Sequence, residues 1–288
     1  MPPRRGVLLS VFYSGDDRAA VMKFYDADSG EIFLVKDETE HKPYLLTNAP
    51  EERISEALSE FASRIHSISR VRKYDILRDK EVELTKVEAK DPLAIGGSPK
   101  NMRDTLAKLG YDVWEARIKY YDCFIFDRNL IPGCLYEVDD SGNPRRISIE
   151  VELEEDLLNS DGEVRDILLS TIPLFDEPSP SMPNAALDIE VLSPLDKIPD
   201  PREPDKPVAA AAIVDSSGRK EVHVLHRGGS LPDELPNGAK LISYESEGRL
   251  IRSLLDRISE YPLLFTYNGD NFDLPYLAKR AEKLGGER

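Results

Sequence analysis

The sequence predicts a mixed α/β protein of the α+β kind, with a β-rich first domain over residues 1–180 and a second domain over residues 181–288. Three observations lead to this prediction. Residues 6–47 show the alternation of apolar and polar side chains that is typical of strands. Residues 173–184 contain four prolines, which disfavour helix and central strand and therefore indicate a domain boundary. After that segment, three short strand patterns precede a helix, a strand and a second helix.

The composition allows sizeable cores. The chain has 288 residues, of which 40% are hydrophobic, and this length is sufficient for two domains. No apolar run approaches the roughly 20 residues of a membrane-spanning helix, and no signal-peptide pattern is present at the start. The sequence therefore predicts a cytoplasmic protein without a membrane partner. Cys123 and Cys134 are too few for a disulfide framework or a zinc site; we expect buried free thiols, with an intracellular disulfide as the alternative.

The net charge of −16 is unusual for a protein that binds nucleic acid, because contacts to phosphate require Lys and Arg. Acidic residues that hold metal ions are an exception, since the bound cations reverse the local field. The charge therefore predicts weak DNA affinity for the isolated chain and leaves a metal-dependent nuclease open.

The first domain is predicted to combine strand pairs with helices. Strands are expected at residues 7–13, 20–25, 31–35, 41–46, 70–77, 82–89, 135–138 and 146–153. Apolar residues at three- and four-residue steps predict a helix over residues 50–65, and Ser98 is expected to cap another helix that ends at Gly110. The aromatic-rich segment 111–133 is interpreted as core, with a stacking platform for single-stranded bases as the alternative. The acidic run 150–156 is interpreted as a solvated face.

The second domain is predicted to begin with a strand at residues 185–191, in which two acidic residues interrupt an apolar run. Side chains alternate faces along a strand, so Asp188 and Glu190 point the same way, with their Cα atoms about 7 Å apart. Two carboxylates held side by side among apolar neighbours repel each other and lose hydration, and a hard divalent cation relieves both costs. The pair is therefore a candidate metal site.

A polar stretch at residues 266–273 follows a short buried strand and leads into the last helix. This helix is predicted from Asp273 to Leu284, and Asp273 suits its N-cap position, so an ordinary structural role stays open for this residue. His223 and His226 lie three residues apart near one predicted strand and would face opposite sides, which argues against a shared metal ion.

Together the two acidic stretches resemble the first two exonuclease motifs of the family B DNA polymerases. Asp188-Ile189-Glu190 alone is a weak motif, but the block from Tyr267 to Gly285 is long and specific, and it is similar to the archaeal members in particular. The resemblance implies a ribonuclease H-like exonuclease fold for residues 181–288, preceded by a β-rich template-binding domain. The family's third exonuclease motif normally lies beyond the last residue of this chain, so we expect an incomplete exonuclease domain.

The resemblance also implies roles for individual residues. Asp188, Glu190 and Asp273 are expected to be catalytic ligands of two divalent ions, Mg²⁺ or Mn²⁺, in a 3′–5′ proofreading exonuclease. One ion lowers the pKa of a water molecule and the other stabilises the leaving 3′-oxygen. Asn268 and Phe272 are expected to contact the nucleic acid.

The archaeal members also carry, in many cases, a pocket for template uracil in their first domain. Lys42-Pro43-Tyr44 resembles one wall of that pocket and residues 90–95 resemble another, so Pro43, Tyr44 and Ile95 are candidate nucleic-acid-binding residues. The chain departs from the family at Asp122-Cys123, where close relatives have basic residues.

The favoured hypothesis is the N-terminal part of a DNA-directed DNA polymerase of replication and repair, inactive as a polymerase and weak or inactive as an exonuclease by itself. Its expected partners are single-stranded and primer-template DNA, the remainder of the polymerase chain and, through that remainder, a sliding clamp. The alternative from another class is a non-catalytic single-stranded DNA-binding module that senses uracil. A third hypothesis is a stand-alone ribonuclease H-like nuclease, for which the fourth carboxylate is missing.

Overall fold

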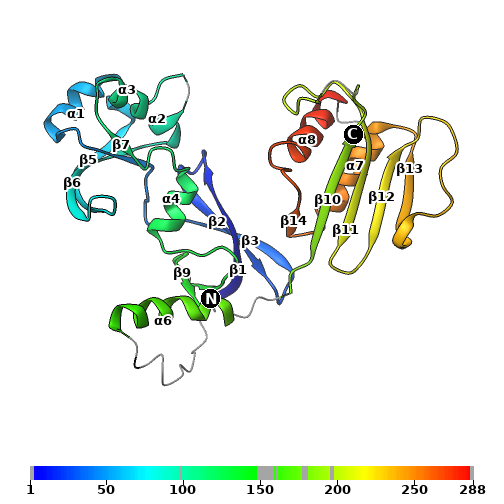
Figure 1. The fold of residues 1–288 in the computed structure, drawn as a ribbon, viewed down its shortest axis with the longest axis horizontal. Helices are drawn as coiled ribbons and strands as arrows, with labels where there is room; N and C mark the ends of the chain where they lie inside the picture. Colours follow the sequence, from blue (N-terminus) through cyan, green and yellow to red (C-terminus); the bar gives the residue numbers. More distant parts are fainter. Residues whose placement is uncertain are drawn as a thin grey trace. The chain divides into compact units, whose positions relative to one another are not determined.

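Two units divide the chain in the computed structural model, Met1–Pro180 and Ser181–Arg288, and both combine strands with helices (Figure 1). The structure describes residues 3–97, 99–147, 159, 161–176, 181–194 and 198–285. The predicted mixed α/β class is confirmed. Within these described ranges, none of the helices combines the length and the apolar composition that a membrane span requires.

The first sheet of the first unit is antiparallel and has the order β3-β2-β1-β8-β9. Its strands are β1 (Arg4–Ser14), β2 (Ala19–Asp26), β3 (Glu31–Lys36), β8 (Leu135–Val138) and β9 (Pro144–Arg146). Helix α4 (Tyr120–Asp127) packs Tyr120 and Phe124 into the core of this sheet, which also contains Phe24 and Tyr136. The interpretation of the aromatic segment as core therefore holds for these two residues of α4.

The second sheet of this unit has the order β5-β6-β4-β7, with β4 (Tyr44–Thr47), β5 (Ile65–Asp75), β6 (Lys80–Ala89) and β7 (Val113–Trp114). Its helices are α1 (Glu51–Ala57), the 3-10 helix η1 (Ser59–Arg64), α2 (Pro92–Gly96) and α3 (Met102–Lys108). Apolar side chains of α1, η1 and α3 enter one core with those of β4 and β6, among them Leu45, Ile54, Phe61, Val87 and Leu106.

Several boundaries differ from those predicted. The helix expected over residues 50–65 is two short helices, because Leu58 leaves the helical conformation (φ −109°, ψ 24°) and Ile65 already pairs with Ala89 as the first residue of β5. The N-cap of α3 is Asn101, whose side chain accepts the N–H of Asp104 at 2.8 Å. The expected cap, Ser98, lies outside the described residues.

The proline-rich segment was expected to contain no helix, and this expectation is wrong for its first residues. Helix α6 (Gly162–Asp176) continues through position 173. A proline removes one N–H from the helical ladder, and near the end of a 15-residue helix this loss affects only the last turn. Residues 148–153 of the expected strand at 146–153, and the whole acidic run 150–156, lie outside the described part of the chain.

The second unit is built on one mixed sheet with the order β13-β12-β11-β10-β14. Its strands are β10 (Asn184–Val191), β11 (Val208–Asp215), β12 (Lys220–Leu225), β13 (Lys240–Tyr244) and β14 (Leu263–Phe265). A short 3-10 helix, η2 (Pro236–Gly238), precedes β13. β10 pairs antiparallel with β11 and parallel with β14, so β10 is a central strand.

Helices α7 (Glu247–Ile258) and α8 (Asp273–Lys283) bury their apolar stripes in one core with the sheet. The core combines Ala185, Leu187 and Ile189 of β10 with Ala211 and Ile213 of β11 and with apolar side chains of both helices, which are Leu250, Ile251, Leu254, Tyr276 and Leu277. Because the buried side chains of β10 alternate with exposed ones, the other face of this strand points away from the helices.

Candidate functional site

The exposed face of β10 carries the predicted acidic pair. Asp188 and Glu190 are exposed, whereas Leu187 and Ile189 are buried at 2% and 6% exposure. This alternation follows directly from the two-residue period of the strand. Both carboxylates therefore project from the sheet face opposite the core.

A β-bulge lies directly opposite the second carboxylate. Glu190 is in register with Ala210, but the next residue, Val191, is in register with Val208, so Ala209 is the extra residue of β11. Bulges bend the strand that contains them and change the direction of nearby side chains, and they are frequent beside active sites.

The third predicted carboxylate reaches this strand from α8. Asp273 is the first helical residue, and its side chain is 4% exposed. Its Oδ1 accepts the backbone N–H of Ile189 at 3.1 Å, between the positions of Asp188 and Glu190. The residue at the N-cap position is Phe272, so Asp273 lies inside the helix, and its carboxylate interacts with the N–H of Ile189 as well as with its own N–H. The interpretation of Asp273 as an ordinary N-cap is therefore wrong.

The electrostatics of Asp273 are those of a carboxylate that lacks a counterion. Burial raises its pKa, and the nearby negative charge of Asp188 acts in the same direction, while the N–H groups of Ile189 and Asp273 partly oppose the rise. Of the Lys, Arg and His side chains that the structure describes, none forms an ion pair with Asp188, Glu190 or Asp273.

Carboxylate oxygens are the ligands that hard divalent cations prefer, so this donor set fits Mg²⁺ or Mn²⁺ chemically. The described side chains do not gather three His, Cys, Asp or Glu residues into one ready metal-binding group. Asp188 is close enough to Asp273 to affect its pKa, and Glu190 shares the exposed face of β10 with Asp188. A shared site for all three stays a proposal.

The turn before α8 is held tightly. The carbonyl of Asn268 accepts the N–H groups of Asn271 and Phe272, each at 3.1 Å, and Asn268 has a positive φ of 59°. A Cβ at Gly269 would collide with the side chain of Thr266, so only glycine fits there. Asn268 is exposed beside the turn, whereas the ring of Phe272 packs on Tyr276 at 5.5 Å. Nucleic-acid contact is therefore accessible to Asn268 and restricted for Phe272.

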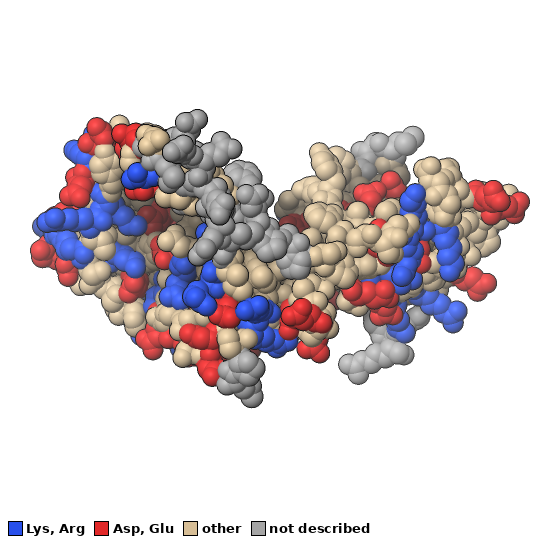
Figure 2. Space-filling model, turned by 90° about the horizontal axis from the view of Figure 1, so that it is seen from below, with Lys and Arg blue, Asp and Glu red and all other residues tan. Residues whose placement is uncertain are grey.

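The other three predicted residues meet in the first unit. Pro43, Tyr44 and Ile95 line one cavity of about 1060 Å³. The sequence placed Arg117 and Lys119 beside the aromatic segment and Lys90 in a pocket wall, but it did not bring them together with Arg18, Arg64 and Arg103, because these residues come from separate segments and share no local pattern. The basic residues of the lining are Arg18, Arg64, Lys90, Arg103, Arg117 and Lys119. Lys and Arg side chains form patches on the surface in Figure 2, although the chain has a net charge of −16.

Tyr44 is held in this cavity by polar contacts. Its hydroxyl donates to Oδ1 of Asp127 at 3.3 Å, and Nε2 of His41 lies 2.9 Å from the other oxygen of the same carboxylate. The ammonium of Lys86 lies 4.3 Å from the centre of the Tyr44 ring. Burial raises the pKa of Tyr44 far above its usual range, so the hydroxyl stays protonated.

The two cysteines are buried and form no disulfide. Cys123 lines the same cavity as Tyr44, and burial raises the pKa of its thiol to about 11. A thiol with this pKa is mostly protonated at neutral pH and is a poor nucleophile. Cys123 therefore contributes shape to the cavity rather than chemistry.

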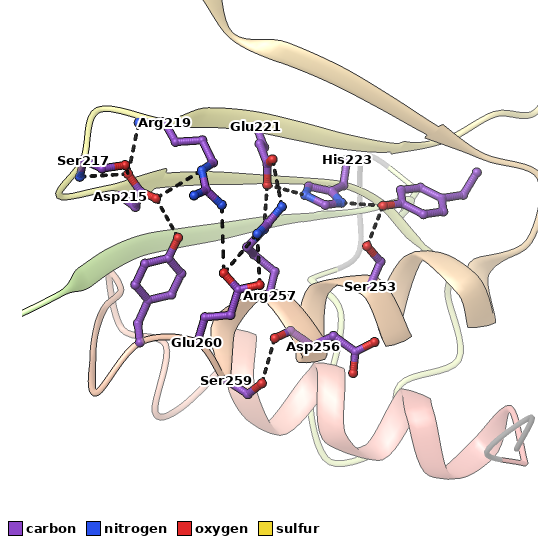
Figure 3. A network of polar contacts seen from close by, with 12 residues as sticks. Asp215, Ser217, Arg219, Glu221, His223, Ser253, Asp256, Arg257, Ser259 and Glu260 are labelled. Atoms are coloured by element: carbon purple, nitrogen blue, oxygen red, sulfur yellow. Dashed lines mark hydrogen bonds and ion pairs between the residues drawn. The ribbon is translucent and has the colours of Figure 1, made fainter. Parts of the chain in front are cut away.

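A polar network joins α7 to the sheet of the second unit (Figure 3). The guanidinium of Arg257 donates to both oxygens of Glu221, at 2.9 and 3.0 Å. Nδ1 of His223 lies 2.8 Å from the hydroxyl of Tyr244. Nε2 of His226 instead lies 3.1 Å from the carbonyl of Gly229.

Comparison with known proteins gives a consistent result. The sequence profile of the DNA polymerase family B exonuclease domain matches residues 111–288. DNA polymerase 1 of Aeropyrum pernix is 39% identical over 99% of this chain and 30% of its own length. DNA polymerase 1 of Sulfolobus acidocaldarius is 33% identical over 96% of this chain and 32% of its own length.

A solved structure extends the comparison to the fold. The family B DNA polymerase from Pyrobaculum calidifontis superposes with a TM-score of 0.59 at 23% identity, over 98% of this chain and 32% of that chain. The chain thus spans about 30% of the length of the relatives it matches. The profile match begins inside the first structural unit, so the sequence family and the two units do not share a boundary.

The resemblance read from the two acidic motifs is therefore confirmed. Both the profile match, which covers more than half of the chain, and the identity to archaeal DNA polymerases support the same conclusion. The chain belongs to the family B DNA polymerases and corresponds to the N-terminal part of its archaeal relatives, including the exonuclease-domain region.

Proposed function

We propose that this chain supplies template binding and part of a two-metal 3′–5′ proofreading exonuclease to a DNA-directed DNA polymerase. The observation that carries the proposal is the hydrogen bond from the N–H of Ile189 to Asp273, because it joins the two acidic motifs in one place. A carboxylate used only as a helix cap needs no partner on a strand 84 residues earlier in the chain.

Asp188, Glu190 and Asp273 are the residues that would hold Mg²⁺ or Mn²⁺. Such ions activate water and neutralise charge on a phosphodiester. The protein's own part is to hold the three carboxylates near one another. Burial disfavours the ionised form of Asp273, and a bound cation would offset that cost. Asn268, exposed at the start of the turn, is placed to contact the terminal nucleotide.

The face of the sheet that carries the acidic pair is the surface where the remainder of a polymerase chain would pack. Phe265 and Val214 on this face are 54% and 44% exposed, and Ala186 and Ala212 beside them are also exposed. Apolar sheet faces usually have a cover. The remainder of the polymerase chain would also provide any contact with a sliding clamp. The proposed place of action is the cytoplasm.

The test is degradation of a 3′-labelled single-stranded oligonucleotide with Mn²⁺, comparing the wild-type chain with Asp188→Ala. No degradation by either protein supports a partial site that needs further polymerase residues. Degradation that the substitution abolishes supports the third hypothesis, a stand-alone nuclease. Degradation that persists in the variant contradicts the assignment of Asp188.

The second candidate function is a non-catalytic single-stranded DNA-binding module, which the basic cavity around Tyr44 favours. Aromatic rings and basic side chains together are typical of surfaces that bind single strands. Fluorescence anisotropy with oligonucleotides that differ only in one uracil or thymine tests this function. Equal affinity for both rejects uracil sensing, and no binding at low salt rejects the module altogether.

A further inference from the structure

A buried ion pair supports the β-bulge opposite Glu190. The N–H of Val208, at the bulge, donates to Oε1 of Glu247 at 2.9 Å. Arg280 donates to both carboxylate oxygens of Glu247, at 2.8 and 2.7 Å. The two side chains are only 14% and 10% exposed, so the pair is largely shielded from water.

One face of α8 makes the contacts on both sides of the bulge. Asp273, Tyr276 and Arg280 are spaced by three and four residues and therefore share that face. Asp273 binds the N–H of Ile189 before the β10–β11 connection, and Tyr276 donates to the carbonyl of Lys206 at 2.7 Å near its end. Arg280 binds Glu247, which in turn accepts the N–H of Val208 at the start of β11.

The side chains of α8 also hold the connection itself. Lys283 and Arg280 donate to the carbonyl of Pro204 at 3.0 and 3.4 Å, and Lys279 donates to the carbonyl of Arg202 at 3.1 Å. Helix α8 thus provides Asp273 to the candidate site and also holds the connection that follows Asp188 and Glu190 in the chain.

We propose that Arg280 and Glu247 form a positioning pair for the acidic site: by holding the bulge at Ala209, they set the direction of Glu190 relative to Asp188. Without Arg280, the carboxylate of Glu247 is buried and uncompensated, so it turns to water. The N–H of Val208 then loses its acceptor, and the bulge relaxes.

The second unit offers a matched control. Arg257 and Glu221 form another two-bond ion pair, at 2.9 and 3.0 Å, with side chains 24% and 5% exposed. This pair joins α7 to β12 (Figure 3), and strand β11 separates β12 from the acidic strand β10 (Figure 1). Loss of either pair costs stability, but only the loss of Arg280 is expected to change the bulge.

The experiment compares Arg280→Met with Arg257→Met in the full 288-residue chain by hydrogen exchange and mass spectrometry. Peptides that contain Ile189 and Val208 are expected to exchange faster in Arg280→Met and at the wild-type rate in Arg257→Met. Equal exchange of these peptides in both variants overturns the proposal. If Arg280→Met does not fold, Arg280→Lys, which keeps the charge but loses the two-bond geometry, is expected to show the same selective change at smaller size.

Calorimetric titration with Mn²⁺ supplies the second readout, and this part of the inference rests on the proposed metal site. Arg280→Met is expected to weaken Mn²⁺ binding about tenfold, the lower end of the effect of residues that orient metal ligands, while Arg257→Met leaves it unchanged. Unchanged Mn²⁺ affinity in Arg280→Met means that the pair is merely structural. If the wild-type chain binds no Mn²⁺, the metal site is rejected, and hydrogen exchange still decides whether the pair holds the bulge.

Discussion

Replacement of Asp273 separates its two roles, as a hydrogen-bond acceptor and as a buried charge. Asp273→Ala removes the acceptor of the Ile189 N–H, which is buried in the core of the second unit. An unsatisfied buried N–H costs about 1–3 kcal/mol. We therefore expect Asp273→Ala to lower the free energy of unfolding by about this amount at pH 7.

Asp273→Asn has the same shape, keeps an acceptor oxygen and removes the charge. Burial raises the pKa of Asp273 in the folded state, so ionisation of this carboxyl group opposes folding. The stability that the protonated group contributes is complete below the unfolded-state pKa. It is lost as the pH rises through the folded-state pKa. Asp273→Asn avoids that loss. We expect the metal-free Asn variant to be at least as stable as the wild type at pH 7, and the difference to shrink as the pH falls.

Urea denaturation followed by far-ultraviolet circular dichroism, between pH 4 and 8, measures both effects. The single tryptophan, Trp114, lies in the first unit, so its fluorescence serves as an internal control that should not change. Equal destabilisation by Asn and Ala at pH 7 would refute the reasoning, because the charge of Asp273 would then stabilise the metal-free protein.

Three further outcomes are expected. Gly269→Ala should destabilise the second unit in urea, since its Cβ would collide with the side chain of Thr266, and adding Thr266→Gly should restore most of the loss. Asn101→Ala should cost about 1 kcal/mol in thermal unfolding, because it removes the N-cap of α3; an unchanged midpoint contradicts this role. Arg117→Gln should weaken binding of a single-stranded oligonucleotide and reduce its salt dependence; an unchanged salt slope would mean that the residue contacts no phosphate.

Local pattern was sufficient for the elements that bear the acidic motifs. The apolar–acidic alternation of residues 185–191 predicts both the strand and the shared face of Asp188 and Glu190, because the period of a strand is a property of the backbone alone. Local pattern failed at the boundaries: the apolar spacing over residues 50–65 does not show the break of the helix at Leu58, nor the pairing of Ile65 with β6.

The sequence by itself determined the family, the exposed acidic pair and the helix that follows the second motif. Only the tertiary structure decided that Asp273 bonds the N–H of Ile189, that Arg280 and Glu247 hold the bulge at Ala209, and that basic residues from separate segments line one cavity. These contacts join residues far apart in the chain. Their distances depend on how whole elements pack, which is set by the sum of many buried contacts rather than by any local period.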